Sequence, residues 1–332
     1  MRFMLGCVAG VLLAGIALGA ERPEDKPVVL ERAELDGGLV REKIRLPGCD
    51  PSDPVPAIAV YPKEAARLPL VFLFHWFRGS KETMEPWARE LAAKGFFAVA
   101  PDLPWHGERS VKGVFARPDM PNLGEEFAVF IHQSSIAHGA RDFPFLLDAL
   151  RGRKEIDPER LGVGGFSMGA GLVMVLAWQE KRIRAAVSLA GACDFWWDVT
   201  KVPPGPKQDE VKAAYSERVR RLVASIDPWP RADRFAPTPL LMANGRKDGY
   251  IDIESVRRFV EKLKTHYAAT PDRFRFIEED AGHEETARMH REANDWLTRF
   301  LAPPPAPAAG APSAEAVTGR HPASGGGRRG SS

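Results

Sequence analysis

Three residues that together could carry out acyl transfer occur in a fixed order along the chain. Ser167 lies between two glycines in the stretch VGGFSMGAG (163–171), Asp248 lies in LLMANGRKDGYIDIES, and His283 lies in EEDAGHEET. A serine hydroxyl becomes a nucleophile when a nearby histidine accepts its proton, and a carboxylate orients that histidine. We therefore expect Ser167 to be a nucleophile, Asp248 an acid and His283 a base, provided that the fold brings them together.

The surroundings of Ser167 match the pattern G-x-S-x-G at a junction between two elements. The apolar run 160–166 predicts a strand, and residues 168–180 are rich in Ala, Leu, Val and Met, which favours a helix. Gly165 and Gly169 permit the sharp turn between them, because side chains would clash there. Such a turn presents Ser167 at the carboxyl end of its strand and directs the amide of Met168 toward a developing negative charge.

Four histidines follow Ser167 in the sequence: His266, His283, His290 and His321. Two of them, His266 and His290, fall within predicted helices, and His321 lies in the C-terminal tail. His283 instead follows the last predicted strand, in a loop before a helix. It is therefore the expected base.

The expected acid is Asp248, in the loop after the strand predicted at 239–245. Asp252, in the same stretch, is better interpreted as the N-cap of the next helix, because Ser255 follows three residues later. Asp194 lies just past the strand predicted at 183–191. It stays open as an alternative acid.

Apolar periodicity predicts an α/β fold built on one sheet. Eight strands are expected, and the later ones alternate with helices, which favours a mostly parallel sheet with helices on both faces. The first two strands have no helix between them, alternate polar and apolar residues, and are expected to pair antiparallel at one edge as half-exposed strands. The predicted strands are 39–46, 55–62, 69–75, 96–102, 160–166, 183–191, 239–245 and 273–279.

Residues 192–235, after the sixth predicted strand, interrupt the alternation of strands and helices. The segment contains three of the eight tryptophans and is far longer than a simple crossover requires. We interpret it as a helical, cap-like insertion with its own helix at about 207–225.

These motifs resemble the α/β-hydrolase superfamily, and most closely its dienelactone-hydrolase-like and small serine esterase branches. The resemblance extends over about residues 39–301 and implies the order nucleophile, acid, histidine that Ser167, Asp248 and His283 follow. FHWFRGSKE (74–82) is similar to the family's His-Gly-Phe-x-Gly stretch. This similarity implies oxyanion donors at the amides of Phe77 and Met168, although Trp76 replaces the usual glycine.

Aromatic residues in segments at the same end of the sheet are candidates for the substrate pocket. The expected pocket residues are Phe77, Trp76, Trp105, Trp196, Trp197 and Trp229. Core packing explains large aromatic residues equally well in general.

The resemblance implies a serine hydrolase that cleaves carboxylic esters through an acyl-enzyme intermediate. Dienelactone hydrolases proper carry a cysteine nucleophile, whereas this chain has Ser167. A peptidase of the prolyl-oligopeptidase type is an alternative, but such enzymes carry a large N-terminal propeller for which residues before 39 leave no room. A non-catalytic binding protein on a hydrolase scaffold is a further alternative.

The two ends of the chain differ in composition from the middle. Residues 1–20 have one arginine, an apolar run and then small residues, which is typical of a secretory signal peptide. Residues 302–332 are rich in Pro, Ala, Gly and Ser, which predicts a disordered tail. We therefore expect an exported protein with one hydrolase domain at 21–301 and no stable membrane insertion after signal cleavage.

Charge and cysteine content restrict the possible partners. The 46 basic and 44 acidic residues leave a net charge of +2, which gives no indication of nucleic-acid binding. Cys49 and Cys193 are interpreted as separate small apolar side chains, although a disulfide between them is permitted. No metal-ligand spacing is present, so we expect no metal and no cofactor. The expected partner is a small-molecule ester, and the oligomeric state is left open.

Overall fold

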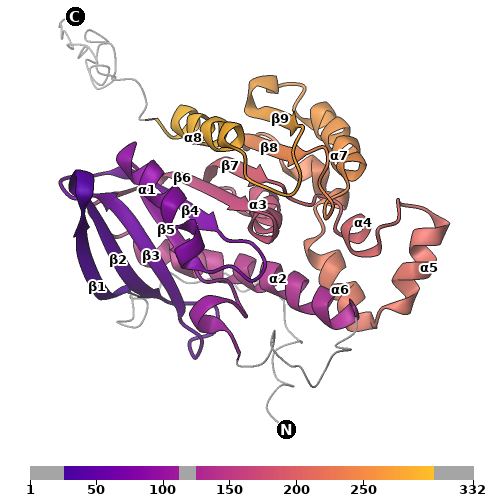
Figure 1. Cartoon of the computed structure of the whole chain (residues 1–332), viewed down its shortest axis with the longest axis horizontal. Helices are drawn as coiled ribbons and strands as arrows, with labels where there is room; N and C mark the ends of the chain where they lie inside the picture. Colours follow the sequence, from indigo (N-terminus) through magenta and orange to yellow (C-terminus); the bar gives the residue numbers. More distant parts are fainter. Residues whose placement is uncertain (1–25, 112–124, 303–332) are drawn as a thin grey trace, which may run out of the picture. The chain divides into compact units, whose positions relative to one another are not determined.

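The computed structural model of the protein describes residues 26–111 and 125–302. The predicted signal peptide and the tail from residue 303 lie outside the described residues. The described chain forms one nine-stranded sheet in the order β1-β2-β3-β5-β4-β6-β7-β8-β9 (Figure 1). The strands are β1 Val28–Leu35, β2 Leu39–Leu46, β3 Val55–Pro62, β4 Leu68–Phe74, β5 Phe97–Pro101, β6 Ile156–Phe166, β7 Ile183–Leu189, β8 Leu240–Gly245 and β9 Phe274–Glu279.

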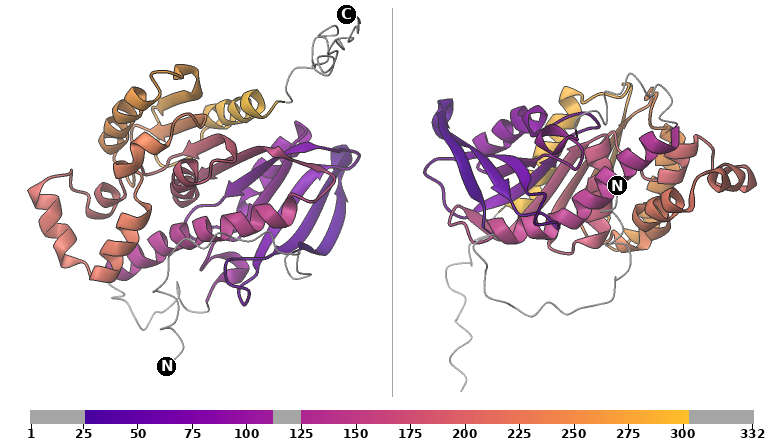
Figure 2. Two further views of the ribbon diagram at one scale, coloured as in Figure 1. Left: turned by 180° about the vertical axis from the view of Figure 1, so that it is seen from behind. Right: turned by 90° about the horizontal axis from the view of Figure 1, so that it is seen from below.

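The sheet is parallel from β5 to β9 in the spatial order and antiparallel among β1, β2, β3 and β5. Helices cover both of its faces (Figure 2). Three further helices, α4 Phe195–Thr200, α5 Pro206–Ala214 and α6 Glu217–Ile226, lie on the side of the molecule away from β1. The mostly parallel sheet with flanking helices is the α/β-hydrolase arrangement that the sequence predicts. The helices that pack on the sheet are α1 Glu85–Ala93, α2 Glu125–Leu150, α3 Met168–Gln179, α7 Ile253–His266 and α8 Ala287–Leu301.

Side chains of the central strands alternate between two apolar clusters, one on each face of the sheet. In β4, Leu70, Phe72 and Phe74 join the cluster under α2, α3 and α7, whereas Val71 and Leu73 join the cluster under α1 and α8. This alternation follows from the two-residue period of a strand. It explains why β4 has a continuously apolar sequence, since both of its faces are covered.

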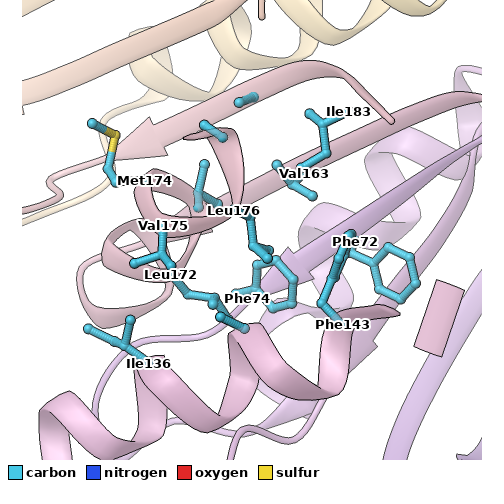
Figure 3. Close-up of a cluster of buried hydrophobic side chains, with 14 of the residues drawn as sticks. Phe72, Phe74, Ile136, Phe143, Val163, Leu172, Met174, Val175, Leu176 and Ile183 are labelled. Atoms are coloured by element: carbon cyan, nitrogen blue, oxygen red, sulfur yellow. The ribbon is translucent and has the colours of Figure 1, made fainter. Parts of the chain in front are cut away.

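The cluster between α2, α3 and the sheet contains closely packed aromatic rings (Figure 3). The ring of Phe143, on α2, lies edge-on to Phe72 and Phe74 of β4, with centroid separations of 5.1 and 6.2 Å. Leu172 of α3 and Ile136 of α2 belong to the same cluster. This packing fixes α3, which begins directly after Ser167, against the sheet.

The sheet contains one strand more than the eight predicted. The additional strand, β1, pairs antiparallel with β2 and forms the edge. Its residues are mostly exposed, so its sequence VVLERAEL lacks the alternation on which the prediction relied. The predicted antiparallel pairing of 39–46 with 55–62 is confirmed as β2 and β3. However, β3 is buried on both faces rather than half-exposed, because it lies between β2 and β5 and packs against α1.

The insertion contains three helices where the sequence predicts one. The predicted helix at 207–225 is broken at Tyr215, and Ser216 starts a new helix by accepting a hydrogen bond from the amide of Val219. A further short helix, α4, precedes both. The helices are α4 Phe195–Thr200, α5 Pro206–Ala214 and α6 Glu217–Ile226, followed by a 3-10 segment at Trp229–Arg234.

Within residues 26–111 and 125–302, no helix combines the length and apolar character needed to cross a bilayer.

Candidate active site

The candidate residues lie where three parallel strands end. Ser167 directly follows β6, Asp248 lies three residues after β8, and His283 lies four residues after β9. Strands β6, β7, β8 and β9 are consecutive neighbours in the sheet and run parallel. Their carboxyl ends therefore lie at one edge, so residues far apart in sequence meet there.

Ser167 occupies a strained backbone conformation, with φ 55° and ψ −117°. Its amide donates to the carbonyl oxygen of Leu189 at 2.9 Å, which ties the turn to β7. A Cβ atom on Gly169 would lie 2.0 Å from the carbonyl oxygen of Phe74, and one on Gly165 would lie 2.5 Å from the backbone of Gly169. The two glycines thus permit the close approach that holds a non-glycine residue at positive φ.

A continuous hydrogen-bond chain connects the three predicted residues. His283 Nε2 lies 2.8 Å from Ser167 Oγ, and His283 Nδ1 lies 2.7 Å from Asp248 Oδ2. The Asp248 side chain is fully buried, while 17% of the His283 side chain is exposed. With Nδ1 donating to the carboxylate, Nε2 is free to accept the proton of the serine hydroxyl.

Asp248 is held as a carboxylate by the groups around it. Burial acts to raise its pKa, but the hydrogen bonds from His283 and from the amides of Ile251 and Tyr250 outweigh burial, and the pKa is lowered. Both amides donate to Oδ1, at 2.9 and 2.8 Å, which leaves Oδ2 for the histidine. The carboxylate is therefore ionised and oriented at neutral pH.

The alternative acids and bases take no part in this hydrogen-bond chain. Asp194 caps α4, where Oδ1 accepts from the amide of Trp197, and Asp252 caps α7, where Oδ1 accepts from the amide of Glu254. Among the histidines, His266 is the last residue of α7, and His290 in α8 contacts Glu285. The N-cap predicted at Asp252 is confirmed.

A cavity of about 570 Å³ opens beside Ser167 and His283. Its volume lies within the range of small-molecule sites, about 300–1,000 Å³. The described residues that line it are Trp76, Phe77, Arg78, Ala128, Val129, His132, Gln133, Phe166, Ser167, Asp198, Val199, Lys201, Tyr250, Ile251 and His283.

The loop after β4 borders this cavity and accommodates Trp76, at the position where the resemblance implies a glycine. The left-handed position of the loop is Arg78, with φ 67°, and not Trp76. The Trp76 ring packs edge-on against Phe166, with centroids 5.8 Å apart. The loop closes through a bond from the Gly79 amide to the Trp76 carbonyl oxygen, at 2.9 Å. The backbone of Trp76 therefore lies outside the left-handed region, and this position does not require glycine.

Four of the five predicted pocket tryptophans do not line the cavity. Trp105 donates to Ser134 Oγ at 3.1 Å, and Trp197 donates to Asp252 Oδ2 at 3.1 Å. The other two pack on neighbouring rings, Trp196 against Tyr215 and Trp229 against Phe259. Trp105 thus joins the loop after β5 to α2, and the other three pack within the insertion or against α7, as the alternative of core packing allows. The assignment of these four to the pocket is therefore corrected.

Several cavity residues were not singled out from the sequence. Those on α2 are Ala128, Val129, His132 and Gln133. The last three follow Ala128 by one, four and five residues, which places all four on one helix face. Others come from the insertion and the acid loop, namely Asp198, Val199, Lys201, Tyr250 and Ile251. The helical spacing shows that the α2 residues share a face, but nothing in the sequence says that this face borders Ser167.

The described residues contain no group of three or more His, Cys, Asp or Glu side chains placed to hold a metal ion. Cys49 and Cys193 are both free thiols.

Comparison with known proteins assigns the family. The profile of the Dienelactone hydrolase family matches residues 55–283, more than half of the chain and including all three residues of the hydrogen-bond chain. The chain belongs to the dienelactone hydrolase family.

Relatives of this dienelactone hydrolase family member include esterases. It is 26% identical to YitV of Bacillus subtilis (strain 168), over 70% of this chain and 90% of YitV. It is 24% identical to Esterase YjfP of Escherichia coli (strain K12), over 63% of this chain and 81% of that protein. The solved acetyl xylan esterase from Paenibacillus sp. R4 shares the fold, with a TM-score of 0.58 and 21% identity over 83% of this chain and 87% of that chain. The protein is an ester hydrolase of the dienelactone-hydrolase-like branch.

Proposed function

We propose that the protein cleaves carboxylic esters through an acyl-enzyme intermediate on Ser167. The observation that carries this proposal is the chain from Ser167 Oγ through His283 to Asp248, with separations of 2.8 and 2.7 Å. Each residue then has a role: Ser167 is the nucleophile, His283 the general base and Asp248 the orienting acid.

The reaction follows from these positions. Ser167 Oγ attacks the ester carbonyl carbon while His283 Nε2 takes the hydroxyl proton. The carbonyl oxygen becomes an oxyanion that accepts from the amides of Met168 and Phe77, since Met168 is the first residue of α3 and its amide has no partner within the helix. Collapse breaks the bond to the alcohol, which leaves with the proton from His283. Water then attacks the acyl-serine by the same path and releases the acid.

The proposed substrate is a small neutral ester. Seven of the cavity-lining residues are apolar, and they provide a surface for the acyl or alcohol group: Trp76, Phe77, Ala128, Val129, Phe166, Val199 and Ile251. Esterase YjfP and the Paenibacillus acetyl xylan esterase are ester hydrolases by name, which supports the same class of substrate here.

A fluorophosphonate probe tests the nucleophile directly, because it forms a covalent bond with an activated serine. We expect the wild-type protein to be labelled and to hydrolyse 4-nitrophenyl acetate. Ser167→Ala should lose both the labelling and the turnover. Ser225→Ala, an exposed serine in α6, serves as the matched control and should keep both. Labelling that persists in Ser167→Ala would place the nucleophile elsewhere.

We also propose that the protein is exported. The proposal rests on the apolar run and small residues of positions 1–20.

A further inference from the structure

One wall of the cavity carries a buried amide that lacks a partner. Helix α2 supplies Ala128, Val129, His132 and Gln133 to the lining. Gln133 is only 1% exposed, and within the described part of the chain its Oε1 accepts no hydrogen bond. A buried acceptor without a donor costs folding free energy, and native proteins leave few of them. Gln133 lines the cavity, so a rotation of its side-chain amide that turns Oε1 toward the cavity would let a donor on the ligand satisfy this acceptor.

The neighbouring residue provides a donor. Gln133 Nε2 lies 3.4 Å from His132 Nδ1. An amide nitrogen can only donate, so His132 Nδ1 is the acceptor and the ring proton of His132 is on its own Nε2. Burial lowers the pKa of His132, so the ring is neutral at neutral pH. The wall therefore offers an acceptor at Gln133 and a donor at His132, both uncharged.

Two charged groups that act on this wall are paired with each other. Asp198 and Lys201 act electrostatically on His132 and also line the cavity. Lys201 Nζ lies 3.0 Å from Asp198 Oδ1 and donates to the carbonyl oxygen of Tyr250 at 2.6 Å. Because the two charges compensate each other, this region favours neither an anionic nor a cationic ligand group.

We propose that the α2 wall binds a hydroxyl group of the substrate. A hydroxyl can donate to Gln133 Oε1 and accept from His132 Nε2, which a plain alkyl group cannot do. The substrates are then neutral esters that carry a hydroxyl in the acyl or the alcohol part. This inference rests on the proposed function, because it assigns the cavity beside Ser167 as the ester site.

Matched ester pairs test the inference on the wild-type protein. The acyl pair is 4-nitrophenyl 3-hydroxybutyrate and 4-nitrophenyl butyrate, and the alcohol pair is 2,3-dihydroxypropyl acetate and propyl acetate. A site built to bind a hydroxyl discriminates against the analogue that lacks it. We expect kcat/KM to be about 10- to 100-fold higher for the hydroxylated member of one pair. The pair that responds identifies the part of the ester that meets α2.

A variant assigns the preference to the amide. Gln133→Leu removes both polar atoms with little change in size, so the hydroxylated and plain esters should react with nearly equal kcat/KM. The plain ester should lose less kcat/KM than the hydroxylated ester does, because it makes no hydrogen bond to Gln133. Gln208→Leu is the matched control: Gln208 is also 1% exposed, donates to the Val202 carbonyl oxygen at 2.6 Å and does not line the cavity. This control should keep the wild-type preference.

Two results would overturn the inference. One is equal kcat/KM within both pairs for the wild-type protein, which needs no variant. The other is an equal loss for both members of a pair in Gln133→Leu and in the longer-chain Gln133→Met, which would indicate a structural role. Failure of the proposed function looks different, since the wild-type protein would then hydrolyse no ester and Ser167 would not be labelled.

Discussion

The strained conformation of Ser167 depends on the absence of side chains around it. Its positive φ raises the local energy by about 1–3 kcal/mol, which the surrounding packing must offset. Gly169 lies against the end of β4, and Gly165 lies against the first turn of α3. The serine is therefore held in place by contacts that only glycine allows.

Gly169→Ala should disrupt this turn, because the added Cβ would lie 2.0 Å from the Phe74 carbonyl oxygen and 2.7 Å from that of His75. Both neighbours are backbone atoms and cannot simply rotate away. We expect a clearly lower melting temperature and loss of fluorophosphonate labelling. Gly152→Ala is the control, since nothing lies within 4 Å of its Cβ position. A Gly169→Ala variant as stable and reactive as Gly152→Ala would contradict the geometry.

Asp248→Asn should impair catalysis without removing the side chain. An asparagine can still contact His283, but it does not stabilise the imidazolium and favours the wrong tautomer. We expect kcat for 4-nitrophenyl acetate to fall by about four orders of magnitude. The same change at Asp194, which caps α4, should leave kcat close to the wild-type value. The opposite pattern would assign the acid to Asp194.

At the scale of elements, α4 connects the insertion to the loop that carries the acid. Trp197 of α4 donates to Asp252, and Lys201, at its end, donates to the carbonyl oxygen of Tyr250. Asp227, which follows α6, accepts from the amides of Phe195 and Trp229 and so connects both ends of the insertion. Through these contacts the insertion packs against the loop that carries the acid.

Asp227 should make the stability of the protein depend on pH. Burial, followed by repulsion from Asp194, raises its pKa from 3.8 to about 7 in the folded state, despite the two amides and Arg231. The folded protein then holds a proton that the unfolded chain releases, so the free energy of unfolding falls as pH rises from 3.8 to about 7 and levels off above that value.

Asp227→Asn replaces the protonated acid by a neutral amide that can still accept from both backbone groups. We expect the free energy of unfolding of this variant, measured by urea titration at pH 5, 6, 7 and 8, to fall less steeply with pH than that of the wild-type protein. Asp209→Asn, in α5 with an exposed side chain, is the control and should keep the wild-type slope. Identical slopes in all three proteins would show that Asp227 does not titrate in this range.

At the scale of the whole molecule, the topology of the sheet assembles the site. Residues 167, 248 and 283 are separated by 81 and 35 positions, yet they meet because β6, β8 and β9 end at one edge. The described residues from 26 onward contain the hydrogen-bond chain and both apolar clusters. The proposed signal peptide, at 1–20, precedes all of them.

Expression in a secreting bacterial host should therefore yield a mature protein that begins after Gly19 or Ala20, since small residues precede the cleavage site. Intact-mass measurement of the periplasmic and secreted fractions checks this. A variant without residues 2–20 should stay in the cytoplasm with unchanged ester hydrolysis. Recovery of the uncleaved chain in the membrane fraction would indicate an anchor instead.

Local sequence patterns were sufficient for much of the fold and for the order of the three candidate residues. The apolar runs of β4 and β6 identify strands because a strand covered on both faces must be apolar throughout. The G-x-S-x-G pattern locates the turn at Ser167, and the end of β9 locates His283. The exposed strand β1 has no such pattern, so its place at the sheet edge was not predicted.

The composition of the cavity was decided by the tertiary structure alone. Trp197 and Trp229 resemble pocket residues in the sequence but contact Asp252 and Phe259, at helix α7. In contrast, His132 and Gln133 look like ordinary helix residues and line the cavity. Periodicity tells which residues share a face, since it reflects the geometry of one element. Which two faces meet depends on how distant elements pack, and no local pattern records that.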